Sequence, residues 1–206
     1  MNDPRRFAPA TARNRDAILA VLARVVPAGA NVLEIASGSG EHAVYLAPRL
    51  DVASWQPTDA DAEARRSIDA WRAEARADRV LPALALDVTA PWPRLPAAPD
   101  AIVCANMIHI APWSACLGLL EGAATVLAPG GVLYLYGPYR RDGRHTAPSN
   151  EAFDASLRSR DPAWGVRDLE SVTAEAAARG LALVEVVEMP ANNLSVVLRK
   201  AAPPVA

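Results

Sequence analysis

The feature that most constrains the fold of this chain is a short apolar segment that runs directly into a loop with two glycines. Residues 32–35 have the character of a buried strand, and residues 36–40 turn the chain into the start of a helix. Gly38 and Gly40 allow a ligand to approach backbone that carries no side chain, and the helix N-terminus offers free N–H donors. An ordinary tight turn between a strand and a helix explains the same two glycines.

Strand-like and helix-like segments alternate along the chain, which favours βαβ units and a parallel sheet. The segment 101–105 is entirely apolar and is expected to be central. The connection 189–193 is long enough only for an antiparallel turn. We therefore expect one α/β domain over residues 1–206, a doubly wound and mostly parallel seven-stranded sheet that closes in an antiparallel hairpin. The expected strands are 31–35, 52–57, 80–86, 101–105, 132–136, 181–188 and 194–199.

The helices are expected between these strands. The first begins with Thr11 as N-cap and presents an apolar stripe at helical spacing. Asp168 is expected to cap a helix that ends at Gly180. The polar stretch 137–167 is expected to hold one short helix around 153–160 and to form a lid-like insertion over the sheet edge.

Two carboxylates strengthen the case for a ligand at the glycine loop. Asp59 follows the second strand, where a carboxylate accepts hydrogen bonds from ribose hydroxyls, and Asp87 follows the third, where it meets an adenine edge. Open α/β sheets bind ligands at the carboxyl edge of their strands, and the loop and both acids fall there. Either acid alone is as readily a solvated turn residue or a helix cap. Together they favour a cofactor that contains a nucleoside.

Two such cofactors fit the loop, because residues 38–43 also match the dinucleotide pattern G-x-G-x-x-A. Glu34, inside the strand before the loop, instead favours S-adenosylmethionine, since methyltransferases often hold an acid there. The closing antiparallel hairpin favours the same cofactor, because the dinucleotide fold is typically all parallel. A methyltransferase is preferred; an NAD-dependent oxidoreductase and an S-adenosylmethionine-binding protein without catalysis remain alternatives.

Composition narrows the remaining classes. The net charge is -2, and no run of basic residues offers a phosphate-binding stripe, so nucleic acid is not expected as a partner. No stretch of about 18 apolar residues and no signal peptide occurs, which predicts a soluble cytoplasmic protein. Cys104 and Cys116 lie in apolar segments and are expected to be buried thiols. The three histidines are scattered, and no metal site is expected.

Several motifs together resemble a known family. The chain resembles class I S-adenosylmethionine-dependent methyltransferases and is similar, from Pro9 to Lys200, to the methyltransferase-like 26 family, known as domain of unknown function 938. Ala36 departs from the general E-x-G-x-G pattern, and it is tolerated if its φ is negative. The matching segments are 13–14, 34–43, 55–59, 86–88, 106–113, 136–139, 149–154, 164–168 and 189–193.

The resemblance implies S-adenosylmethionine as the cofactor and does not supply a substrate. The residues assigned to cofactor binding lie in the first helix and at the carboxyl ends of the first four strands. They are Arg13, Glu34, Ala36, Ser37, Gly38, Gly40, His42, Asp59, Ala60, Asp87, Val88, Asn106, Met107 and Ile108.

Methyl transfer is an in-line displacement that requires chiefly the alignment of a nucleophile with the methyl group. Asn106 lies over the methyl in class I enzymes and is a catalytic candidate together with His109 and Tyr139. His109 is equally a helix cap, and Tyr139 equally packs against the following loop. A covered pocket favours a small-molecule acceptor. The residues expected to bind it are His109, Trp113, Tyr139, Asn150, Arg167, Asn192 and Asn193, the last two of which serve equally as turn residues.

Overall fold

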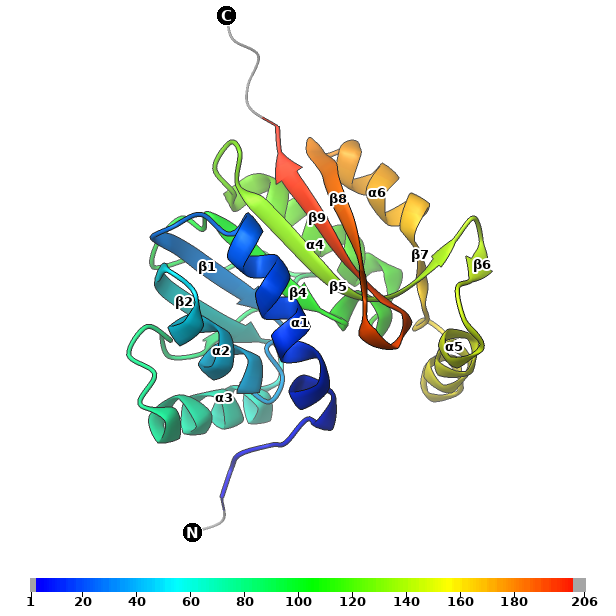
Figure 1. Cartoon of the computed structure of the whole chain (residues 1–206). Coiled ribbons are helices and arrows are strands. Elements are labelled where there is room, and N and C mark those ends of the chain that lie inside the picture. Colours follow the sequence, from blue (N-terminus) through cyan, green and yellow to red (C-terminus); the bar gives the residue numbers. More distant parts are fainter. Residues whose placement is uncertain (1–2, 202–206) are drawn as a thin grey trace, which may run out of the picture.

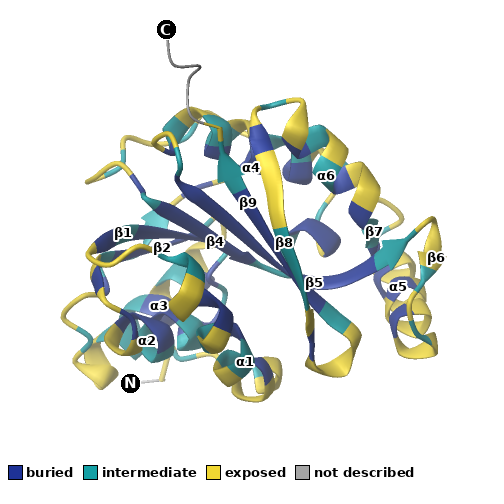
Figure 2. Cartoon of the chain, turned by 45° about the horizontal axis from the view of Figure 1, so that its top comes forward, coloured by how far each residue is buried: buried dark blue, intermediate teal, exposed yellow. Residues whose placement is uncertain are grey.

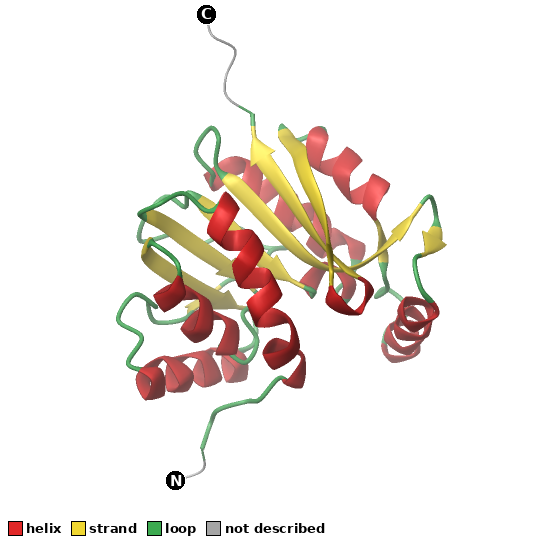
Figure 3. Ribbon diagram, in the orientation of Figure 1, coloured by secondary structure: helices red, strands yellow, loops and turns green. Residues whose placement is uncertain are grey.

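A computed structural model describes residues 3–201 as one central sheet with helices on both faces (Figures 1 and 3). Seven strands run in the order β3-β2-β1-β4-β5-β9-β8, and two short strands, β6 and β7, also pair with β5. β1, β2, β3, β4 and β5 are parallel, whereas β9 is antiparallel to both β5 and β8. The predicted doubly wound sheet with a closing antiparallel hairpin is confirmed.

The elements have the following bounds. The strands are β1 Ala30–Ile35, β2 Val52–Asp59, β3 Leu84–Ala85, β4 Ala101–Ala105, β5 Val132–Arg141, β6 Arg144–His145, β7 Arg167–Asp168, β8 Leu181–Met189 and β9 Asn193–Lys200. The helices are α1 Pro9–Val25, α2 Glu41–Leu46, α3 Ala62–Ala75, α4 Trp113–Val126, α5 Pro148–Arg160 and α6 Leu169–Ala177, with short 3-10 turns η1 Ala47–Arg49, η2 Met107–His109 and η3 Pro190–Asn192.

The sheet separates two apolar cores. One core contains buried residues of α1 and α2, and the other contains buried residues of α4 and α6. The central strands are buried along most of their length (Figure 2), because each is covered by helices on both faces. Cys104 and Cys116 both lie in the core beneath α4, so the expected burial of the two thiols is confirmed. Burial raises the pKa of Cys116 to about 12 and that of Cys104 further still.

Three sequence predictions about local structure are corrected. The third strand is only Leu84–Ala85, with one isolated bridge from Val80 to Trp55 upstream, because Pro82 interrupts the segment and has no N–H to donate. α1 begins two residues before Thr11, at Pro9, and Ala8 is its N-cap. Proline is well suited to the first helical position, where no N–H partner is needed.

The third correction has functional consequences. β5 does not end at 136 but continues to Arg141, and its last residues pair with β6, β7 and β9. The first part of the expected lid is therefore strand, and the rest carries α5, which is longer than predicted. Asp168 does cap α6, where its carboxylate accepts a hydrogen bond from the Ser171 N–H.

Candidate functional site

The loop after β1 has the backbone geometry of a ligand-binding turn. Ala36, Gly38 and Gly40 all have positive φ, at 54°, 59° and 93°. Gly40 is also required by close packing, since a Cβ there would lie 2.7 Å from the Cα of Ile68 in α3. The expectation that Ala36 has a negative φ is wrong, and an alanine in this conformation costs about 1–2 kcal/mol.

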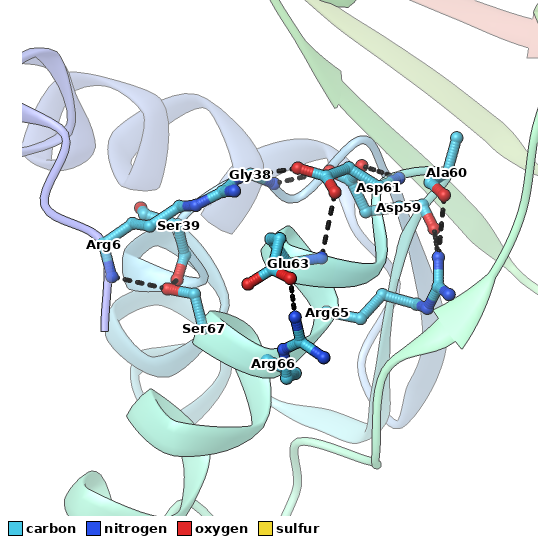
Figure 4. A network of polar contacts seen from close by, with 10 residues as sticks. All are labelled: Arg6, Gly38, Ser39, Asp59, Ala60, Asp61, Glu63, Arg65, Arg66 and Ser67. Atoms are coloured by element: carbon cyan, nitrogen blue, oxygen red, sulfur yellow. Dashed lines mark hydrogen bonds and ion pairs between the residues drawn. The ribbon is translucent and has the colours of Figure 1, made fainter. Parts of the chain in front are cut away.

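Asp59 lies directly against this loop. One carboxylate oxygen accepts a hydrogen bond from the Gly38 N–H at 3.0 Å, and the other accepts one from the Asp61 N–H at 2.9 Å (Figure 4). Ala60 is exposed beside it, and its carbonyl accepts a hydrogen bond from Arg65. The two features singled out in the sequence, the glycine loop and the acid 21 residues further on, are thus in contact.

Glu34 is buried within β1 beneath the same loop. Its carboxylate accepts a hydrogen bond from the indole N–H of Trp55 at 3.0 Å. Burial raises the pKa of Glu34 to about 7, although the bond from Trp55 opposes that shift. The Ser37 hydroxyl bonds the Glu34 carbonyl and the Thr58 N–H, which joins β1 and β2 where the loop begins.

The carboxyl end of β3 is more open. Asp87 is exposed and accepts hydrogen bonds from the backbone and the hydroxyl of Thr89. These bonds lower the pKa of Asp87, so it is a carboxylate at neutral pH. Val88 is buried next to it, in the core beneath α4.

The N-terminal helix contributes a contact that the sequence prediction did not assign. His42, in the first turn of α2, shares a 2.9 Å hydrogen bond between its Nε2 and the side-chain oxygen of Asn14. Burial lowers the pKa of His42 to about 4, so the ring is neutral and its Nε2 carries the proton that Asn14 accepts. Arg13, the neighbour of Asn14, is exposed.

The chain after β4 turns sharply at Asn106, which has a positive φ of 63° and caps η2. Its N–H donates to the Tyr136 carbonyl at the end of β5. Met107 is half-buried and Ile108 is buried in the core beneath α4. Asparagine tolerates this left-handed conformation better than most residues.

A cleft of about 750 Å³ opens beside Asn106, between α1, the end of β5, α5 and the η3 turn. Figure 1 shows these elements grouped at the carboxyl edge of the sheet. The cleft is lined by Ala10, Arg13, Asn14, Asn106, Ile110, Tyr136, Pro138, Ser149, Asn150, Phe153, Pro190, Ala191, Asn192 and Asn193. Of the residues predicted to bind cofactor or substrate, the structure brings Arg13, Asn106, Asn150, Asn192 and Asn193 together here.

His109 and Tyr139 do not line this cleft. Both have an exposed fraction of 0%, and their rings pack edge to face, with centroids 4.9 Å apart. β5 explains the placement, because successive side chains of a strand face opposite sides. Tyr136 and Pro138 point to the cleft, whereas Tyr139 lies in the core beneath α4. Tyr136 was missed because the strand was expected to end there.

His109 serves as a packing and hydrogen-bonding centre in the structure. Its Nδ1 accepts the Arg167 N–H at 3.2 Å, and its carbonyl accepts the Gly165 N–H. Burial and the nearby guanidinium of Arg167 lower the pKa of His109 to about 3. A Cβ on Gly137 would lie 2.5 Å from its Nε2, so the ring lies directly against β5.

Arg167 stabilises the loop that follows β4 through hydrogen bonds to its backbone. Its guanidinium donates to the carbonyls of Ile108 and Ala111 at 2.8 and 2.5 Å, and to that of Ala163 at 3.0 Å. It also lies 5.6 Å from the ring centre of half-buried Trp113. Neither Arg167 nor Trp113 lines the cleft, so the structure places both as supports of the η2 loop.

The β8–β9 hairpin and α5 are joined through amides. Asn150, with an exposed fraction of 4%, donates to the Asn192 carbonyl at 2.9 Å and to the Thr146 hydroxyl. Asn192 has a positive φ of 58°, as expected for a turn residue, but the second such position is Ala191 rather than Asn193. The Asn193 amide closes the turn on the Pro190 and Ala191 carbonyls.

Two further findings concern metal ions and membranes. Within residues 3–201, no group of three or more His, Cys, Asp or Glu side chains is arranged to hold a metal ion. None of the helices in the same part of the chain is long and apolar enough to cross a bilayer.

Comparison with models of known families identifies the family to which this chain belongs. The model of a family described as a protein of unknown function, DUF938, matches residues 5–200. The chain belongs to this family. The description of the DUF938 family carries no activity, so the function must be argued from the site.

Several methyltransferases of known structure have the same fold. A putative O-methyltransferase from Nostoc punctiforme matches with a TM-score of 0.79 and 18% identity, over 93% of this chain and 57% of that one. The mitomycin 7-O-methyltransferase MmcR matches with 0.77 and 16%, over 93% and 54%. The S-adenosylmethionine-dependent methyltransferase SibL matches with 0.74 and 22%, over 94% and 56%. The DUF938 chain thus has the class I methyltransferase fold and spans little more than half of these relatives.

Proposed function

We propose that this DUF938 protein binds S-adenosylmethionine at the carboxyl edge of its sheet and transfers the methyl group to a small molecule. The observation that carries the proposal is the hydrogen bond between Asp59 and the Gly38 N–H. It joins the glycine loop after β1 to the acid at the end of β2, where a nucleoside binds in folds of this kind. The methyltransferase fold favours S-adenosylmethionine over NAD as that nucleoside cofactor.

Each proposed cofactor residue has a task suited to its place. Asp59 retains carboxylate lone pairs for the ribose hydroxyls, and Asp87, ionised and exposed, meets the adenine. Arg13 supplies the cation for the methionine carboxylate from the wall of the cleft. Asn106 follows β4 and lines the cleft, and we place the methyl group beside it. The loop and its supports are Glu34, Ala36, Ser37, Gly38, Gly40, His42, Ala60, Val88, Met107 and Ile108.

The cleft beside Asn106 is the proposed acceptor site. Enclosure by α5 and the η3 turn suits a small molecule, and a nucleophile held there within about 3–3.5 Å of the methyl needs little further assistance. His109 and Tyr139 are buried, so we propose that they act by shaping the loop rather than by touching the acceptor. The lid-like role of residues 137–167 and membership of the methyltransferase-like 26 family remain predictions.

Calorimetry with S-adenosylhomocysteine, S-adenosylmethionine and NAD tests the cofactor. We expect the first two to bind and to raise the melting temperature, because a ligand that binds only the native state stabilises it. Asp59→Ala should weaken binding about tenfold, the effect of losing one to two hydrogen bonds. Asp51→Ala is the matched control, since Asp51 is an exposed acid that directly precedes β2, at the end of the strand opposite to Asp59.

Two outcomes contradict the proposal as a whole, and a third contradicts the role given to Asp59. Binding of NAD without S-adenosylhomocysteine would make the protein a candidate oxidoreductase. Tight binding of S-adenosylmethionine with no methyl transferred to any acceptor would leave a cofactor-binding protein without catalysis. If Asp59→Ala and wild type bind S-adenosylhomocysteine with equal affinity, Asp59 is only a turn residue and does not bind the cofactor.

A further inference from the structure

The chemistry of the cleft lining restricts what can be methylated there. Within the described residues, the lining contains five asparagines, one serine, one tyrosine and one arginine, and its other members are apolar. Among residues 3–201, no carboxylate, lysine, histidine or thiol is part of this lining. Side chains that remove a proton near neutral pH are of those types, so the lining offers an incoming acceptor no general base.

Most acids on the elements around the cleft are engaged elsewhere, and Glu151, the exposed acid of α5, does not line the cleft. Asp154, on the same helix as Asn150, binds Arg158 and the Val166 N–H. Glu34 lies beneath the glycine loop and binds Trp55. Acids on α1, α2 and β8 are also paired. On α1, Asp16 accepts a hydrogen bond from the Tyr45 hydroxyl. On α2, Glu41 accepts hydrogen bonds from the Ala8 N–H and the Ser39 hydroxyl, and on β8, Glu188 pairs with Arg141.

Tyr136 is the one lining side chain with a titratable hydroxyl, and its neighbours keep it protonated. Its exposed fraction is 3%, and burial raises the pKa of its hydroxyl although a hydrogen bond from the Asn14 side chain opposes the shift. The amide of Asn14 is oriented in turn by His42, whose Nε2–H occupies the amide oxygen. Asn14 and Tyr136 line the same cleft, and because Tyr136 stays protonated, its hydroxyl can donate to a ligand there.

We propose, on the basis of the methyltransferase function above, that the acceptor is a small organic acid that enters the cleft as its carboxylate. A carboxylate oxygen attacks the methyl carbon of the sulfonium, the C–S bond breaks, and its electron pair stays on sulfur. The products are a methyl ester and neutral S-adenosylhomocysteine. Atoms and charges balance with no proton transferred, so the reaction matches a cleft without a base.

Other acceptors fit the same cleft poorly. An alcohol must lose its proton as it is methylated, and no group in the described lining takes it. An amine is mostly protonated at neutral pH, and a cation finds no carboxylate among those lining residues. An anion, in contrast, meets the Tyr136 hydroxyl as donor and is attracted to the positive sulfonium.

Matched probes test the acceptor class. Protein first loaded with S-adenosylhomocysteine is titrated with benzoate, benzyl alcohol and benzylamine, and then with hexanoate, hexanol and hexylamine. We expect the acid of each series to bind at least tenfold more tightly than its partners, and methyl transfer from labelled S-adenosylmethionine to be confined to the acids. Failure of the cofactor proposal appears separately, as the absence of binding in the loading step.

Tyr136→Phe supplies the residue-level test. It should weaken binding of the acid probes about tenfold and leave the affinity for S-adenosylhomocysteine unchanged. Tyr134→Phe, two residues earlier on the same face of β5, is the control, because the Tyr134 hydroxyl binds Ser195 away from the cleft. The proposal is overturned if an alcohol or amine binds or is methylated as well as its acid, if neither acid binds, or if Tyr136→Phe binds the acids as wild type does.

Discussion

The two sides of β5 differ at its carboxyl end: one side faces the open cleft, and the other is buried beneath α4. On the side of α1, Tyr136 and Asn14 both border the open cleft. On the side of α4, Tyr139 and His109 have no exposed surface, and the Tyr139 hydroxyl and the His109 Nε2 have no hydrogen-bond partner within residues 3–201. Two tyrosines three residues apart thus have opposite environments.

The difference shows that accessibility, not residue type, selects the functional group. On the α1 side Asn14 is paired with His42, and Tyr136 lines the cleft. On the α4 side the rings of His109 and Tyr139 pack against each other. Arg167 stabilises the η2 loop there by donating hydrogen bonds to three backbone carbonyls. A change on the α4 side should therefore lower stability first, whereas a change on the α1 side should lower ligand affinity first.

The largest effect is expected from Gly137→Ala. The added Cβ would lie 2.5 Å from the Nε2 of His109, a buried ring without room to move. Overpacking of this kind should lower the free energy of unfolding by about 3 kcal/mol, measured by urea denaturation. Gly143→Ala is the control: a Cβ there meets nothing within 4 Å, and only its positive φ of 71° costs about 1 kcal/mol. Equal losses in the two variants would argue against a rigid α4 side.

Arg167→Met should have the next largest effect. Methionine keeps the apolar stem but leaves the carbonyls of Ile108, Ala111 and Ala163 without their donor. We expect a loss of about 2 kcal/mol in the free energy of unfolding. Arg13→Met, on the exposed α1 side, should change stability by no more than about 0.5 kcal/mol while it weakens cofactor binding. The reverse pattern would contradict the division between the two sides.

The two buried histidines make stability depend on pH. Their folded-state pKa values, about 4 for His42 and about 3 for His109, lie below the unfolded value of about 6.5. Between pH 6.5 and 4 the unfolded chain binds protons that the folded chain excludes, so each histidine lowers stability as the pH falls, by up to about 1.4 kcal/mol per pH unit. Glu34, with its pKa raised to about 7, acts in the opposite direction over pH 7 to 4.5.

Denaturation of His109→Gln and His42→Gln at pH 6 and at pH 4.5 isolates these contributions. Each variant should lose less stability than wild type over that interval, because it lacks one histidine that must be protonated on unfolding. The difference should be about 1.4 kcal/mol per pH unit for each. A wild-type slope in either variant would mean that its ring is already accessible to protons in the folded state.

The smallest effect is expected from Ala36→Gly. Glycine adopts the positive φ of 54° without the steric cost that alanine carries, so the free energy of unfolding should rise by about 1 kcal/mol. The same substitution at Ala191, whose φ is 57°, is the matched control far from the glycine loop. A gain at Ala191 without a gain at Ala36 would indicate that the loop after β1 relaxes out of this conformation.

Several features were predictable because their signals are local. The alternation of elements, the short 189–193 connection and the cap at Asp168 each depend on residues close in sequence. The strand, the glycine loop and Asp59 were also predictable, since parallel strands bring their carboxyl ends to one edge. The shortened β3 was in principle readable too, because Pro82 interrupts it.

Other features depended on long-range packing. The extension of β5 to Arg141 comes from pairing with β6, β7 and β9, and it reverses which tyrosine meets the cleft. The contact of Asn14 with His42 joins residues 28 positions apart, and that of Arg167 with Ile108 joins residues 59 apart. No periodicity within one segment reports such contacts.

The sequence alone therefore determined the class of fold, the edge of the sheet at which the glycine loop lies, and the acid that meets this loop. Those properties follow from backbone conformation and from the direction of parallel strands. Only the tertiary structure decided that Tyr136 rather than Tyr139 faces the cleft, and that His109 and Arg167 lie behind it. The side of a strand that stays accessible depends on which helices cover it, and that is settled only when distant segments pack together.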